Sequence, residues 1–139
     1  MEKIIILAMF AQVTLSLVVM LIMGKRRFKA AKNKHVQFND FKTMRLDSAG
    51  DNVRVADRNF INQFEIPVLF YVGCIVTLQL NSASYLITAL ACVFVVSRIV
   101  HTVIHIGSNN VRMRFNVFLV GCASVFALWL AIVWRILVF

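Results

Sequence analysis

Long apolar stretches, interrupted by few polar residues, dominate the hydrophobic pattern of this chain. Stretches of about 20 residues, which suffice to cross the hydrocarbon core of a bilayer, occur at four places. We therefore predict an all-α integral membrane protein, folded as a four-helix up-down bundle. The expected spans are residues 3–23, 56–80, 85–107 and 115–138, with a loop at about 24–55, in a single domain covering 1–139.

The second expected span is the least regular of the four. Its apolar part, Ile66–Leu80, is only about 22 Å long as a helix, whereas the hydrocarbon core is about 30 Å thick. The helix is therefore expected to begin earlier, near Val55–Arg58. Pro67 lacks the N–H that would bond to the carbonyl of Gln63, so a kink is predicted there.

Basic residues indicate how the spans are oriented. Most of the 15 Lys and Arg residues lie between Gly24 and Glu65, and the turn at Asn81–Ser84 has none. The positive-inside rule then places both termini on the non-cytoplasmic side. The net charge of +9 is concentrated beside the membrane, which favours contact with anionic lipid headgroups and not with nucleic acid.

Polar residues recur at helical spacing inside two of the apolar segments. They are Arg58, Asn62 and Glu65 in the second segment, and Arg98, His101, His105, Asn109 and Arg112 in and just after the third. At about 100° per residue each set occupies one helix face. Counted from the turn between the two spans, Glu65 and Arg98 lie at similar depths of about 22 and 20 Å. Because ionisable groups are costly in lipid, the two stripes predict a shared polar site between helices.

Three kinds of site fit these stripes. In a purely structural cluster, Glu65 would neutralise Arg98, and Asn62 would bond to His105. The excess of basic residues, which includes Arg114, instead suggests an acidic ligand held by arginine. His101, His105 and Glu65 have the chemistry of a metal site. No metal is expected, however, because the surrounding arginines repel a cation.

The residues of both stripes resemble those of the MAPEG family, the membrane-associated proteins in eicosanoid and glutathione metabolism. Arg58–Pro67 matches the family's R-x-x-x-N-x-x-E pattern, and Arg98–Gly107 looks like its third-helix segment. The resemblance covers essentially the whole chain and is greatest to small bacterial members. It implies a homotrimer in the bacterial inner membrane, with glutathione as cosubstrate bound between subunits.

The resemblance also implies roles for the polar residues. Arg58, Asn62 and Glu65 would hold glutathione, and Arg98 and His101 would complete the polar wall. An arginine just beyond the third helix stabilises the glutathione thiolate in the family. By spacing, this arginine is Arg112 in the leukotriene-forming branch and Arg114 in the prostaglandin branch, and both remain open. His105 and Asn109 complete the candidate ligand-binding set.

Two functions from different classes follow. The first is a glutathione- or thiol-dependent transferase or peroxidase that acts on a lipophilic electrophile from the bilayer. The second is a non-catalytic membrane scaffold, a lipid-binding protein or an accessory subunit of a larger membrane complex. His105 favours the second, because it stands where the better-known enzymes carry tyrosine. Whether the protein is an enzyme is therefore left open.

Overall fold

The computed structural model describes residues 1–33, 38–42 and 49–138, and every regular element in this part of the chain is helical. The elements are α1 (Glu2–Lys32), a short 3-10 helix η1 (Phe38–Lys42), α2 (Asp51–Ile61), α3 (Ile66–Gln79), α4 (Tyr85–Ile106) and α5 (Val111–Val138). Residues 34–37 and 43–48 of the expected loop lie outside the described residues.

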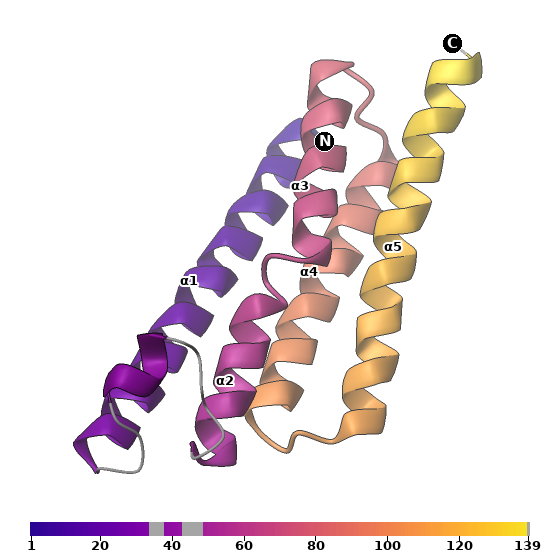
Figure 1. The fold of residues 1–139 in the computed structure, drawn as a ribbon. Helices are drawn as coiled ribbons and strands as arrows, with labels where there is room; N and C mark the ends of the chain where they lie inside the picture. Colours follow the sequence, from indigo (N-terminus) through magenta and orange to yellow (C-terminus); the bar gives the residue numbers. More distant parts are fainter. Residues whose placement is uncertain (34–37, 43–48, 139) are drawn as a thin grey trace.

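Four helical segments are long and apolar enough to cross a membrane, which confirms the expected all-helical architecture. They are Glu2–Lys32, Asp51–Gln79, Tyr85–Ile106 and Val111–Val138. Successive segments run in opposite directions, so both termini lie at the same end of the bundle as the turn between α3 and α4 (Figure 1). We call this end the hairpin half. The opposite end, with the last turns of α1, all of α2, the end of α4 and the start of α5, is the basic half.

The second span begins earlier than expected and is broken instead of kinked. It starts at Asp51, and four residues, Asn62–Glu65, separate α2 from α3 (Figure 1). Pro67 is in the first turn of α3, where its missing N–H costs no hydrogen bond. Just before it, Gln63 and Phe64 donate to carbonyls three residues back, which tightens the end of α2. The proline therefore marks where the helix restarts.

Helices in the hairpin half approach one another closely. Phe70 of α3 stacks on Phe94 of α4 with ring centroids 4.4 Å apart. A Cβ on Gly73 would lie 2.7 Å from Cδ2 of Leu128, so glycine lets the Leu128 side chain of α5 pack directly on the backbone of α3. Small residues at helix contacts have the same role in membrane proteins generally. Trp129 adds a hydrogen bond of 3.1 Å from its Nε1 to the carbonyl oxygen of Leu69.

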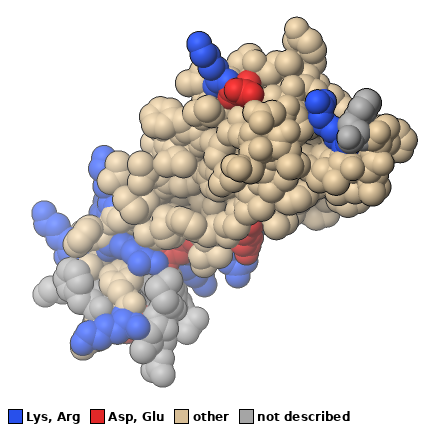
Figure 2. Space-filling model, turned by 90° about the horizontal axis from the view of Figure 1, so that it is seen from above, with Lys and Arg blue, Asp and Glu red and all other residues tan. Residues whose placement is uncertain are grey.

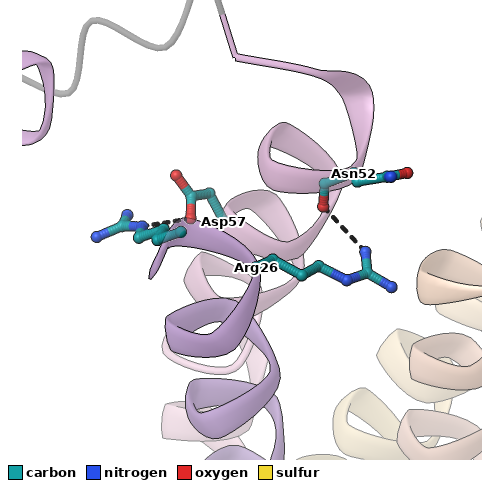
Figure 3. Close-up of polar contacts among 4 residues, drawn as sticks. Arg26, Asn52 and Asp57 are labelled. Atoms are coloured by element: carbon teal, nitrogen blue, oxygen red, sulfur yellow. Dashed lines mark hydrogen bonds and ion pairs between the residues drawn. The ribbon is translucent and has the colours of Figure 1, made fainter. Parts of the chain in front are cut away.

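Helix α1 extends beyond its expected end at residue 23 and reaches Lys32. Two arginines in this extension hold it against the rest of the basic half. Arg27 forms an ion pair of 2.8 Å with the buried Asp57 of α2. Arg26 donates to the carbonyl oxygen of Asn52 at 2.9 Å (Figure 3). The first residues of the expected loop are thus helical because side-chain contacts with α2 keep them so.

Helix α5 also begins earlier than expected, at Val111 instead of residue 115. The side-chain oxygen of Asn110 accepts a hydrogen bond of 3.1 Å from the backbone N–H of Met113. This bond satisfies one of the donors left free at a helix start. The connection between the third and fourth spans is therefore shorter than the sequence predicted.

The outer surface of the bundle is largely apolar. Figure 2 shows a broad surface without charged residues, while most of the visible Lys and Arg side chains gather at one end. Large apolar side chains such as Phe10, Phe126 and Leu137 are exposed on it. In a helical membrane protein such a surface faces lipid or a neighbouring subunit.

Candidate functional site

The site lies in the basic half, beside the break between α2 and α3. A cavity of about 300 Å³ is lined by Arg58, Ile61, Asn62, Glu65, His105 and Arg114. These residues come from the end of α2, the break between α2 and α3, the end of α4 and the first turn of α5. Five of the candidate residues from the sequence therefore meet around one space. Arg58 and Glu65 are also exposed to the outside of the isolated subunit, so the cavity is open on that side.

Arg98 lies behind this cavity and is almost fully buried. Its Nη2 donates a hydrogen bond of 2.8 Å to the carbonyl oxygen of Asn62. The break between α2 and α3 removes that carbonyl's usual helical donor, and a free carbonyl is costly in the membrane. Arg98 therefore stabilises the break that places Asn62 and Glu65 at the cavity.

The ion pair between Glu65 and Arg98, which a purely structural cluster would contain, does not form. The ion pairs Arg27–Asp57 and Arg54–Asp51 occur among the described residues, and neither includes Glu65 or Arg98. Glu65 lies beyond the end of α2, where the change of chain direction exposes its side chain. Glu65 is exposed at the open side of the cavity, whereas Arg98 is buried behind it.

Two buried histidines follow Arg98 on α4. Nδ1 of His101 lies 3.2 Å from the carbonyl oxygen of Arg114, so it carries the hydrogen and donates, which leaves Nε2 as an acceptor when the ring is neutral. The ring centroid of His105 lies 5.5 Å from that of His101, edge to face. Neither nitrogen of His105 has a partner among the described residues, so the expected bond from Asn62 is also wrong. Both nitrogens are buried without a partner among the described residues, and the side chain lines the cavity, so a small movement of the ring would let it donate to, or accept from, a ligand.

The two candidate arginines near the start of α5 are placed differently. Nη1 of Arg114 donates a hydrogen bond of 2.6 Å to Oδ1 of Asn109, and Arg114 lines the cavity. Arg112 is exposed and is not among the lining residues. Asn109 has a φ of 49°, a left-handed conformation that Asn tolerates better than most residues. The turn before α5 thus directs Arg114 into the cavity and Arg112 away from it.

A buried polar network beside the site was missed in the sequence. Nε2 of Gln12 in α1 donates to Oε1 of Gln63 at 3.0 Å. Nε2 of Gln63 is near Oδ1 of Asn59 and Oγ1 of Thr102, each at 3.4 Å. The network joins α1, the broken span and α4. The spacing of Asn59 and Gln63, one helical turn apart beside the stripe, was the signal that could have revealed it.

The residues that the structure describes do not form a group of three His, Cys, Asp or Glu side chains suited to a metal ion. Arg58 and Arg114 line the same cavity as Glu65 and His105, and their charges oppose a bound cation. The donor set suits an anion with several oxygens, because each guanidinium offers a planar fork of N–H groups.

A family model matches residues 5–134, which include most of each span and every residue of the cavity. The model is that of the MAPEG family. The chain belongs to the MAPEG family. No match was found among curated proteins or among solved structures. The R-x-x-x-N-x-x-E residues of this MAPEG protein therefore line a cavity together with two residues from later helices, His105 and Arg114.

Proposed function

We propose that this MAPEG protein is a glutathione- or thiol-dependent transferase or peroxidase that acts on lipophilic electrophiles. The observation that carries the proposal is the cavity in which Arg58, Asn62 and Glu65 meet His105 and Arg114. Glutathione has two carboxylates and one ammonium group. Two arginines and one glutamate around a single space offer the complementary charges.

Within this proposal the arginines and Glu65 bind opposite ends of the tripeptide. Arg58 pairs with a carboxylate, and Glu65 accepts hydrogen bonds from the ammonium group. Asn62 has both a donor and an acceptor and orients the peptide between them. His105, whose ring nitrogens have no partner among the described residues, supplies a further hydrogen bond in place of the family's tyrosine.

Arg114 is proposed to stabilise the thiolate. A cation next to a thiol favours its ionised form, which is the nucleophile. The hydrogen bond from Arg114 to Asn109 fixes the guanidinium before the ligand arrives, which lowers the cost of ordering it. In a transfer reaction the thiolate sulfur forms a bond to the electrophilic carbon, and the electron pair released from that carbon leaves with a departing group or, in an addition, takes up a proton. In a peroxidase reaction two glutathione molecules reduce a hydroperoxide to an alcohol and water and become a disulfide.

A homotrimer with the basic half in the cytoplasm completes the proposal. Arg58 and Glu65 are exposed in the isolated subunit, and charged side chains are costly when they face lipid. A second copy of the chain would cover them and close the open side of the cavity. The concentration of Lys and Arg supports a cytoplasmic position for the basic half, with both termini across the inner membrane.

Calorimetric titration of the purified protein with glutathione tests this function. We expect binding by the wild type and loss of the heat signal in Arg58→Ala. Arg54→Ala is the matched control, because Arg54 lies one turn earlier on α2, pairs with the exposed Asp51 and is not among the residues that line the cavity. If the wild type does not bind millimolar glutathione in detergent or in nanodiscs, the enzyme proposal fails. A scaffold or accessory role would then be the better explanation.

A further inference from the structure

A second cavity lies in the basic half, between the end of α1 and the start of α2. Its volume is about 590 Å³, larger than that of the candidate site, and the two share no residue. The lining residues are Arg26, Lys29, Ala30, Asn33, Gly50, Asn52 and Val53. The proposed reaction does not use any of them.

Two basic side chains line the cavity, Arg26 and Lys29, and neither has an ion pair among the residues that the structure describes. Arg26 donates to two neutral carbonyl oxygens, that of Asn52 at 2.9 Å (Figure 3) and that of Ile106 at 3.3 Å. A guanidinium has five N–H groups, so donors remain for a ligand. The side chain of Lys29 has no partner among the described residues. The nearby Asp57 and Asp51 are paired with other arginines, so neither neutralises Arg26 or Lys29.

The cavity lies at the level of the lipid headgroups. The apolar part of α1 ends at Met23, and Arg26 and Lys29 follow about 5 and 9 Å further along the helix axis. The headgroup layer on each side of a bilayer is about 5–8 Å thick. Phe28, between them in the chain, is largely exposed, as aromatic residues at the membrane interface often are. An anion that reaches this cavity is therefore close to the phosphates of the surrounding lipid.

We propose that the cavity between α1 and α2 binds the phosphate of an anionic phospholipid. Arg26 and Lys29 contact the phosphate oxygens, and Asn33 and Asn52 offer polar contacts to the rest of the headgroup. The acyl chains extend along the exposed apolar side of α1 below Lys29, which includes Val18 three helical turns earlier on the same face. This apolar contact distinguishes a lipid from a free phosphate ion.

Native mass spectrometry of the full chain in detergent tests the proposal. Phosphatidylglycerol and phosphatidylcholine with the same acyl chains are added separately, and the retained lipid is counted. We expect the wild type to retain phosphatidylglycerol preferentially and Lys29→Gln to bind it roughly fivefold more weakly, the effect of one basic side chain near an anionic headgroup. Lys25→Gln is the control, because it removes the same charge from the same helix but does not line the cavity. It should stay within about twofold of the wild type.

Three results would overturn the proposal. Equal retention of the two lipids would show that charge is not recognised. Equal weakening by Lys25→Gln and Lys29→Gln would show diffuse attraction to the basic end and no site. Complete displacement of phosphatidylglycerol by 10-fold excess inorganic phosphate would identify a site for a soluble anion. A circular dichroism spectrum of each variant confirms that the helices are intact, so any loss of lipid can be assigned to the side chain.

Discussion

Helix α4 passes through two environments. The contrast between them distinguishes the apolar packing that stabilises the bundle from the polar residues of the candidate site. In the hairpin half its neighbours are apolar and tightly packed, with Phe94 stacked on Phe70 and Ala91 fully buried. In the basic half the same helix buries Arg98, His101 and His105, and ring nitrogens of both histidines lack partners among the described residues.

The difference is informative because unpaired buried polar groups cost stability. A buried donor or acceptor without a partner costs about 1–3 kcal/mol. Most of the unpartnered buried atoms among the described residues lie in or beside the basic half, and His105 is the residue among them that lines the cavity. Such groups are explained when a ligand satisfies them. The predictions below test whether stability depends on the hairpin half and chemistry on the basic half.

The largest effect is expected at Arg114. Replacing it with Ala should lower the rate of glutathione conjugation about 10²-fold, the usual effect of losing one preorganised electrostatic contact to the reacting atom. Arg112→Ala should change the rate less than threefold, because Arg112 is exposed outside the cavity. Steady-state rates with a lipophilic electrophile, compared at equal amounts of folded protein, measure both. If Arg112→Ala causes the larger loss, the assignment of the thiolate-stabilising residue is reversed.

In the hairpin half, Gly73→Ala should affect stability more than rate. The new Cβ would lie 2.7 Å from Cδ2 of Leu128 and 3.3 Å from the indole nitrogen of Trp129, so these side chains must move or α3 and α5 must separate. We expect a loss of about 1–3 kcal/mol in the free energy of unfolding, seen as a lower melting temperature in detergent. Gly24→Ala is the control, since no atom lies within 4 Å of its Cβ position, and it should be neutral or slightly stabilising. An unchanged melting temperature for Gly73→Ala would show that the added methyl group fits without a loss of stability.

The hydrogen bond between Gln12 and Gln63 is polar, like the contacts of the basic half, but it joins two helical segments, like the packing of the hairpin half. Gln63→Leu should lower stability by about 1 kcal/mol, because the side-chain N–H₂ of Gln12 loses its acceptor. Adding Gln12→Leu should restore part of the loss, because both partners are then apolar. Thermal unfolding of the two single variants and the double variant measures the coupling. Strict additivity would mean that the bond contributes nothing.

The sequence was sufficient to predict the features that depend on local pattern. Apolar run length gave the four spans, and helical spacing placed Asn62 and His105 at one cavity. The sequence was not sufficient to predict features that depend on how a helix is rotated or on a residue far away in the chain. Equal depth could not reveal that Glu65 is directed outward, and the place of the helix break depends on Arg98, which is 36 residues beyond Asn62 in the chain. The roles of these residues in binding and chemistry remain predictions.

The smallest effect is expected at Asn109, which contacts Arg114 and does not line the cavity. Asn109→Gly keeps the left-handed backbone at φ 49° and removes only the side-chain acceptor. Arg114 then loses its orientation but not its charge, so we expect a three- to fivefold lower turnover with little change in glutathione affinity. Asn109→Asp retains an acceptor at the same position and should restore most of the rate. A purely structural role for Asn109 would instead lower the melting temperature of the glycine variant and leave its turnover per folded protein unchanged.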